Sequence, residues 1–456
     1  MSRRPRRLAV IALSVMSACT PMPQEAPPSR ASIMTEALPP MRSFSGAAAQ
    51  PPTRSNYEMA QDFLDLAFQM ESGRAVPVMT RFETPISVRV TGTVPGSLVP
   101  DLRALLTRLN NEAGIDIYLT GAPDANITVE AIPRADLQRA VPRAACFVVP
   151  RISSWEEFKE VRRTPQVDWT TLTRRDRATI FVPSDVAPQE IRDCLHEELA
   201  QALGPLNDLY RLPDSVFNDD NIHAVLTGFD MLVLRAYYSA ELRNGMTRGE
   251  AAVRLPDLLA RLNPAGQRPS NAPVNDTSRD WIDAMELALS GGPAPVRRRQ
   301  AAEQAINLTR AFGWTRPRRG FAHYVYGRLQ VSNDSSLALA AFTEAARAYR
   351  ASPDTRLHEA HVAVQLAAFA LSAGDVEQTL ALVDAAIPIA GGYENATLLA
   401  TLMMFRAEAL DLAGQREAAA AVRLDSLGWA RYGFGSEFEV RARLRDIAAL
   451  SPRNQG

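Results

Sequence analysis

Between residues 57 and 182 the spacing of the apolar residues changes several times. Residues 57–69 and 100–113 carry apolar side chains at helical spacing, which predicts two amphipathic helices. Residues 86–90 alternate between apolar and polar side chains, as a half-buried strand does. Apolar runs predict further strands at 115–119, 127–132, 146–149 and 179–182. This order of elements predicts an α+β domain with a mostly consecutive sheet.

Beyond Trp281 the chain is rich in alanine, and its apolar pattern is helical almost throughout. Gly374 and Gly414 each separate two helical runs, roughly forty residues apart, and an earlier turn at Asn333-Asp334 fits the same spacing. Small residues that would let helices pack closely include Ala338, Ala341 and Ala345. This half resembles a tetratricopeptide-like array, and such arrays bind peptides or protein partners on a concave face. The alternative is a helical bundle that only packs against the first domain.

These patterns divide the chain into five segments. A stretch rich in Pro, Asn and Gly at 264–276 marks the main boundary. The segments are a signal peptide at 1–19, a tether at 20–56, the α+β domain at 57–263, a connecting segment at 264–295 and the helical repeats at 296–456.

The first segment has the layout of a bacterial lipoprotein signal peptide. Four arginines precede an apolar run, Leu8 to Met16, that is too short for a permanent membrane helix. Ser17-Ala18-Cys19 then resembles a lipobox, which implies cleavage before Cys19 and a lipid on its sulfur. Thr20 follows, with no aspartate to retain the protein at the inner membrane, so we expect an anchor on the periplasmic side of the outer membrane. An ordinary cleaved signal peptide is the alternative.

The segment from 20 to 56 contains repeated prolines among Ser, Ala and Arg, and it has no sustained periodicity. Such a composition cannot bury enough apolar surface to fold by itself, so it predicts a disordered tether.

Two cysteines remain after Cys19 is modified. An even pair in an oxidising compartment favours a disulfide, here between Cys146 and Cys194. Two buried free thiols are the alternative.

Charge and histidine content limit the classes of partner. The chain has 50 basic and 51 acidic residues, so no strongly basic surface for nucleic acid is expected. It has only 5 histidines, which leaves little material for a multi-histidine metal centre. We expect no bound metal, no cofactor and no nucleic-acid partner, and contact with the membrane through the lipid anchor alone.

The region at 188–203 reads as a helix that Gly204 and Pro205 end. Its apolar residues share one arc, Glu198 lies at the edge of that arc, and Glu197 and Gln201 form the adjoining polar stripe. His196 falls on the far side, and the position four residues after it is an alanine that cannot bind a metal. The informative register therefore begins at Glu197.

In that register the segment resembles the matrixin-like zincins, whose pattern is His-Glu-x-x-His-x-x-Gly-x-x-His. Glu197, Gln201 and Asn207 take the three histidine positions, Glu198 takes that of the general base, and Gly204 takes the turn. Downstream, Phe217 stands where that family has the methionine of its conserved turn. The stretch from about 81 to 262 also resembles an uncharacterised bacterial domain family of unknown function, common in secreted or lipid-anchored proteins.

Replacement of all three histidines leaves a poor zinc site, because zinc prefers imidazole and thiolate ligands. We interpret the set Glu197, Glu198, Gln201, Asn207 and Asp208 as a degenerate cleft kept for binding or structure. The expected function is that of a non-catalytic envelope lipoprotein that binds a protein or peptide partner. The alternative is a metal-dependent peptidase or cell-wall hydrolase with non-standard ligands and Glu198 as base. A plain solvated helix face with no cleft also remains open.

Other polar groups give weaker signals. The run Asn218-Asp219-Asp220-Asn221 lacks the spacing of a calcium-binding loop and is better explained as a capped turn. His358 and His361 are expected on the surface of a helix. Trp429, Arg431 and Tyr432, near the end, are expected to form a terminal capping cluster, with a binding surface as the alternative.

Overall fold

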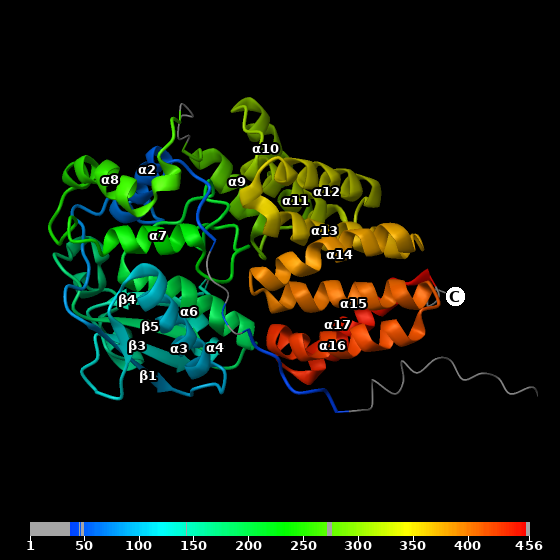
Figure 1. Cartoon of the computed structure of the whole chain (residues 1–456), viewed down its shortest axis with the longest axis horizontal. Coiled ribbons are helices and arrows are strands. Elements are labelled where there is room, and N and C mark those ends of the chain that lie inside the picture. Colours follow the sequence, from blue (N-terminus) through cyan, green and yellow to red (C-terminus); the bar gives the residue numbers. More distant parts are fainter. Residues whose placement is uncertain (1–36, 45, 47–49, 143, 271–275, 453–456) are drawn as a thin grey trace, which may run out of the picture. The chain divides into compact units, whose positions relative to one another are not determined.

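The computed structural model describes residues 37–44, 46, 50–142, 144–270 and 276–452 (Figure 1). The expected signal peptide, its Cys19 and the tether up to residue 36 lie outside the described residues. Within the described part, no helix combines the length and the apolar character needed to cross a membrane.

A five-stranded mixed sheet lies at the centre of the first half of the chain. Its strands are β1 (Ile86–Gly92), β2 (Ile117–Leu119), β3 (Ile127–Ile132), β4 (Phe147–Pro150) and β5 (Ala178–Pro183). They lie in the order β2-β1-β3-β5-β4, and only β4, at one edge, runs antiparallel to its neighbour.

The coarse prediction of an α+β region followed by an all-helical region is confirmed, but the mostly consecutive sheet is wrong. The strands were correctly located, yet β3 lies between β1 and β5, and neither is its neighbour in sequence. Parallel pairs need long crossover connections, and helices supply these between β1 and β2 and between β3 and β5. Apolar periodicity identifies strands and carries no information on which strands become partners.

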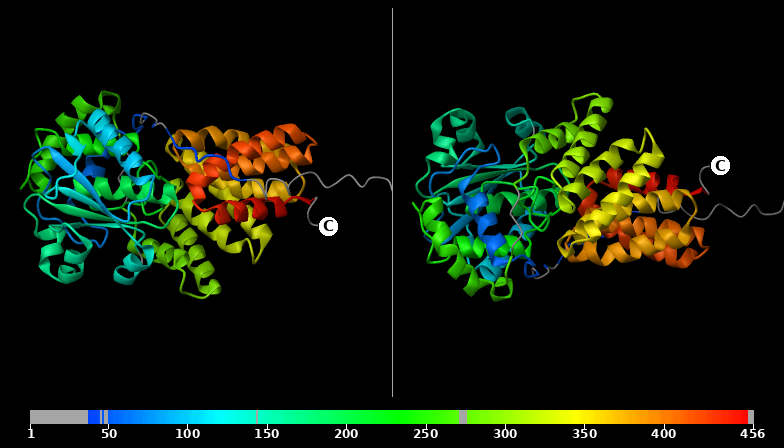
Figure 2. Two further views of the ribbon diagram at one scale, coloured as in Figure 1. Left: turned by 90° about the horizontal axis from the view of Figure 1, so that it is seen from below. Right: turned by 90° about the horizontal axis from the view of Figure 1, so that it is seen from above.

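Helices cover both faces of the sheet (Figure 2). The larger core joins one face to α2 (Asn56–Phe68), α3 (Leu98–Arg108), α6 (Pro188–Leu203), α7 (Gly228–Tyr237) and α8 (Arg248–Leu262). The alternation along the strands sets the two faces, because Ile180 and Val182 join this core while Phe181 points the other way.

The opposite face is covered near β4 and β5 by α4 (Arg134–Ala140) and α5 (Trp155–Val161). Phe181 is fully buried there among Phe147 and Phe158, with ring centroids 5.2 and 5.5 Å away. The edge strand β4 is therefore held between this aromatic cluster and α6.

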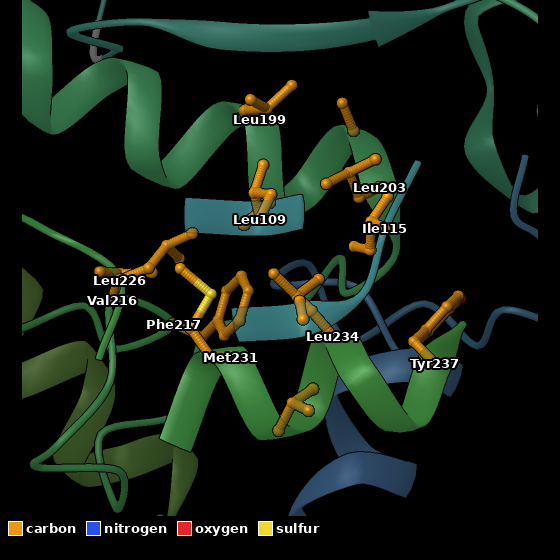
Figure 3. Close-up of a cluster of buried hydrophobic side chains, with 14 of the residues drawn as sticks. Leu109, Ile115, Leu199, Leu203, Val216, Phe217, Leu226, Met231, Leu234 and Tyr237 are labelled. Carbon is orange, nitrogen blue, oxygen red and sulfur yellow. The ribbon is translucent and has the colours of Figure 1, made fainter. Parts of the chain in front are cut away.

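A close-up of the larger core shows how α6 packs against α7 (Figure 3). Leu199 and Leu203 of α6 lie across from Leu234 of α7, with Leu109 of the π-helical turn Leu109–Ala113 between them. Phe217 is fully buried in the same cluster. The residue expected at the position of the methionine turn is thus a core residue beneath α6.

The second half consists of antiparallel helices in which each helix contacts the next. They are α9 (Arg279–Leu289), α10 (Pro295–Ala311), α11 (Pro317–Gln330), α12 (Ser335–Arg350), α13 (Arg356–Ser372), α14 (Val376–Gly392), α15 (Ala396–Leu412), α16 (Arg416–Phe434) and α17 (Glu437–Ala449). Contacts also join alternate helices, such as α13 with α15 and α15 with α17.

The turns and small residues expected from the sequence are where the helices need them. Gly374 and Gly414 end α13 and α15 with φ of 73° and 79°, a left-handed conformation that glycine adopts at no steric cost. Ala338, Ala341 and Ala345 are all buried in α12.

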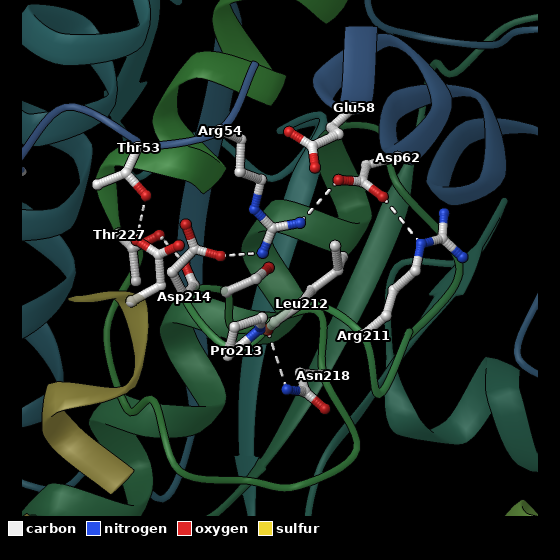
Figure 4. A network of polar contacts seen from close by, with 12 residues as sticks. Thr53, Arg54, Glu58, Asp62, Arg211, Leu212, Pro213, Asp214, Asn218 and Thr227 are labelled. Atoms are coloured by element: carbon white, nitrogen blue, oxygen red, sulfur yellow. Dashed lines mark hydrogen bonds and ion pairs between the residues drawn. The ribbon is translucent and has the colours of Figure 1, made fainter. Parts of the chain in front are cut away.

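Residues 39–44 and 50–55, within the expected tether, lie against the folded chain. Phe44 stacks on Trp429 of α16 with ring centroids 4.6 Å apart, and Arg431 donates to the carbonyl of Pro39 over 2.7 Å. Further along, Arg54 forms ion pairs with Asp62 and Asp214 (Figure 4).

Two expectations are corrected by these contacts. Residues 39–44 and 50–55 are held in place by a few separated side chains, a feature that a Pro-rich composition does not reveal. Trp429 holds that segment rather than capping the C-terminus, and the Tyr432 hydroxyl donates to Asp101 of α3 over 2.8 Å.

Candidate functional site

Helix α6 is fixed at both ends by its local sequence. Pro188 occupies the first turn, where a missing N–H costs nothing, and the helix ends at Gly204. A side chain at Gly204 would meet the Tyr237 ring at 3.0 Å. The buried Arg175 guanidinium donates to the carbonyls of Gln201, Ala202 and Gly204 and so caps the helix end with a positive charge.

The disulfide between Cys146 and Cys194 is present, as the cysteine pattern predicted. It joins the residue before β4 to the middle of α6, with the two Cα atoms 5.9 Å apart. The edge strand therefore runs directly beside the polar stripe of the helix.

Glu198 lies at this junction with 5 % of its surface exposed. It accepts a hydrogen bond from the backbone N–H of Val148 on β4, while its Oε2 has no hydrogen-bond partner. Burial, followed by the charges of Glu197 and Glu71, raises its pKa well above the ordinary value.

The predicted cleft residues do not all converge. The Gln201 amide faces Asp208, with Nε2 and Oδ2 3.5 Å apart. The Asn207 amide instead donates to the carbonyl of Asp65 over 3.0 Å, and its Oδ1 accepts from the Asp208 N–H. Asn207 thus shapes the turn after α6, whereas the charge of Glu197 acts on both Glu198 and Asp208.

Two further carboxylates belong to this site, and the sequence pattern predicted neither of them as part of it. Glu71, Asp208 and Asp219 each offer an oxygen that lies within 4.8 Å of the others. Glu71 belongs to the turn after α2, and Asp219 belongs to the Asn218–Asn221 run. We call Glu71, Glu197, Glu198, Asp208 and Asp219 the acidic cluster.

The charges of the acidic cluster act on each other. Burial and then Glu71 and Asp219 raise the pKa of Glu197 to about 7. Burial and then Glu71 raise the pKa of Asp219 to about 7 as well. The pKa of Asp208 lies well above its ordinary value because of burial and a hydrogen bond with Glu71. Like charges in a partly desolvated site disfavour ionisation of all the groups at once.

His196 lies in the protein interior, away from the acidic cluster. It is 2 % exposed, and its Nδ1 accepts from the Leu226 N–H over 3.1 Å. Burial, with nearby arginines, lowers its pKa well below the ordinary value. The sequence placed it on the side of α6 away from the core, but α6 is buried on most of its circumference, so that expectation is wrong.

The loop that carries Asp219 is a capped turn, as expected, since the Asn218 Oδ1 accepts from the Asp220 N–H. The next residue of this loop, Asp220, contacts the helical region: its Oδ2 lies 2.9 Å from Nε2 of His358 on α13. His358 is 1 % exposed and His361 is also largely enclosed. The prediction of surface histidines is therefore wrong, because α13 packs this face against the loop.

A cavity of about 830 Å³ opens elsewhere, in a size range typical of ligand pockets. Residues 50–53, the loop at 225–229 and the end of α14 line it, with Ile389 and Tyr393 on the helical side. Its lining includes none of the acidic cluster.

No curated protein matches the chain in sequence. Residues 56–257 match the model of a family described as protein of unknown function (DUF2927). The matched part spans α2 to most of α8 and includes the whole acidic cluster. This match supports the assignment of the α/β part of the chain to an uncharacterised domain family, the kind of family that the sequence resemblance indicated.

Proposed function

We propose that the protein is a non-catalytic lipoprotein of the cell envelope, with a degenerate metalloprotease-like domain and a helical-repeat region that binds a protein or peptide partner. One observation supports the proposed loss of catalysis. In the zincin-like register the ligand positions hold Glu197, Gln201 and Asn207, and the Asn207 amide is bonded to backbone groups. Zinc sites need imidazole or thiolate ligands, so this set cannot replace them.

The layout around α6 supports kinship with metalloproteases. A long helix runs beside an antiparallel edge strand, a glycine ends it, and a loop with a buried residue beneath the helix follows. The conserved pattern of that class has a helix, a glycine turn and a methionine turn in this order. In this chain the buried Phe217 stands where that class has the methionine of its turn, beneath the helix.

The contact pattern of the second half supports a tetratricopeptide-like array. Neighbouring helices pair and alternate helices touch, as in stacked hairpins. Helices pack closely at small residues, since a side chain at Gly327 would lie 2.7 Å from the Phe342 ring. The cavity beside the C-terminal end of α14 supports a binding site for a peptide segment.

The anchor and the location rest on the N-terminal pattern. Cleavage before Cys19 and lipidation would hold the protein at the periplasmic side of the outer membrane. The disulfide supports this proposal, because structural disulfides persist in oxidising compartments. Processing that is unchanged in a Cys19→Ala variant would contradict it.

A second candidate, a hydrolase, is favoured by the environment of Glu198. Its buried, unpartnered Oε2 beside an edge strand is a suitable position for a general base or acid acting on an extended substrate.

Zinc analysis of the purified full-length protein distinguishes the two candidates. We expect no stoichiometric zinc after dialysis, in the wild type or in a Glu197→Ala, Gln201→Ala double variant. A Glu190→Gln variant controls for a change elsewhere on α6. Stoichiometric zinc that the double variant loses and the control keeps would contradict the non-catalytic proposal.

Photo-crosslinking in cells tests partner binding. A photoreactive residue at Ile389, which lines the cavity, should give one discrete protein adduct. The matched control is Val253 on α8, which is 79 % exposed and far from the cavity lining. Absence of adducts at Ile389, or equal adducts at both positions, would contradict a specific partner site there.

A further inference from the structure

The acidic cluster has the dimensions of a cation site. Oxygens on opposite sides of a calcium ion are separated by about 5 Å, twice the usual calcium–oxygen distance of about 2.4 Å. Oxygens of Glu71, Asp208 and Asp219 lie within 4.8 Å of one another. They come from three segments separated in sequence, so the fold brings them together, not local chain geometry.

A second observation, independent of this spacing, points to a ligand. Glu198 is only 5 % exposed, and its Oε2 has no hydrogen-bond partner. The charges of Glu197 and Glu71 both act on it, so its carboxyl group lies within electrostatic range of two members of the acidic cluster. Oδ1 of Asp208 is likewise buried without a partner. Buried polar atoms normally have hydrogen-bond partners, and an atom left without one destabilises the folded protein.

The protein supplies little positive charge to this site. The main charges that act on Glu197, Glu198 and Asp208 are acidic, and Arg279 is a basic side chain that acts on Asp219. Arg279 is itself paired with Asp283 and Glu286. A divalent cation would supply positive charge to these carboxylates in place of the protons that their raised pKa values favour.

We propose that the acidic cluster binds a hard divalent cation of the calcium class through Glu71, Asp208 and Asp219. Glu198, whose buried Oε2 lacks a hydrogen-bond partner, would be stabilised in its ionised form by the charge of an ion at this site. An all-oxygen ligand set favours calcium over zinc. Loop carboxylates also suit calcium, which accepts six to eight ligands in flexible geometry and takes water at the remaining positions.

This site is distinct from the zinc register of α6. None of its three ligands, Glu71, Asp208 and Asp219, occupies a position of the zincin-like motif. The ion would tie the turn after α2 and the loop after α6 together at the mouth of the cleft. The inference does not depend on partner binding or on the loss of catalysis.

Calcium titration of the chelator-treated full-length protein tests the proposal, with calorimetry as the readout. We expect one calcium ion per chain and a rise in the melting temperature on binding. Glu71→Gln and Asp219→Asn should each weaken calcium binding by at least about tenfold, a change typical of losing a charged ligand. Asp446→Asn, an exposed carboxylate on α17, should leave the affinity unchanged.

Three outcomes are informative. Saturable binding that both variants weaken supports the site. No saturable calcium binding by folded wild-type protein overturns it, as does binding that neither variant changes. Because Glu71 is exposed, Glu71→Gln keeps the fold. This variant alone therefore decides the test if Asp219→Asn fails to fold. Stoichiometric zinc would contradict the proposed function, whereas this proposal stands or falls on calcium at Glu71 and Asp219.

Discussion

Arg192 on α6 forms an ion pair with Glu394 in the turn between α14 and α15, and both side chains are almost entirely buried. The Gln189 side chain beside it accepts from the Ala396 N–H over 2.9 Å. The helix that carries the candidate site is thus bonded directly to the helical region, and a change in either part reaches the other.

Glu394→Gln should lower the free energy of unfolding by about 3–5 kcal/mol, because it leaves the Arg192 charge buried without its partner. Urea unfolding measures the change. The control is Asp176→Asn, which breaks an exposed pair with Arg174 and should cost less than about 1 kcal/mol. Equal effects of the two substitutions would contradict a buried, stabilising ion pair.

Replacing Cys146 and Cys194 together by alanine should lower the free energy of unfolding by about 2–4 kcal/mol, since their disulfide closes a long loop. Urea unfolding with and without reductant provides the measurement. Reductant should shift the wild type to the level of the variant and leave the variant unchanged. Alkylation of both thiols in native, unreduced protein would refute the disulfide.

Phe44→Ala should expose residues 39–44 to protease, because the ring stacks on Trp429. Trypsin cleavage after Arg42 should accelerate on the order of fivefold, which corresponds to about 1 kcal/mol of lost contact. Met41→Ala, at an exposed position in the same segment, should leave the rate unchanged. Identical cleavage rates for wild type and Phe44→Ala would show that the stack does not hold the segment.

The stability of the protein should fall in weak acid through His361. Burial and then the charge of His358 lower the pKa of His361 to about 3, with Asp220 opposing and His223 and Arg328 adding to the effect. Below the ordinary pKa of about 6.5, the unfolded chain takes up a proton that the folded protein does not. Between pH 6.5 and 5 this should cost about 2 kcal/mol.

Other groups titrate in the same range, so a variant isolates this effect. The free energy of unfolding of His361→Asn should fall less than that of the wild type between pH 6.5 and 5, by about the same 2 kcal/mol. Chemical unfolding at several pH values measures both curves. Parallel curves would mean that His361 does not carry the effect.

Much of the secondary structure followed from the sequence because it depends on local spacing. The five strands, α6 with its end at Gly204, the turns at Gly374 and Gly414 and the disulfide were all predicted. The order of the strands was not, because crossover helices allow several arrangements with the same apolar pattern.

The candidate site was predicted only where its residues lie on one element. Glu197, Glu198 and Gln201 follow from helical spacing, and Asp208 lies in the adjoining turn. Glu71 and Asp219 come from distant loops, and no local pattern links them. Asn207 was placed in the cleft by its spacing, whereas its amide turns toward backbone groups that only the folded loop presents.

Hydrolysis of a diverse peptide mixture tests most directly whether the α/β domain is catalytic. Purified wild-type protein and Glu198→Gln would be incubated with the mixture, with calcium or zinc added, and the products identified by mass spectrometry. The non-catalytic proposal predicts no cleavage above buffer and no difference between the two proteins. Cleavage by the wild type that Glu198→Gln abolishes, while the variant keeps its fold, would contradict it.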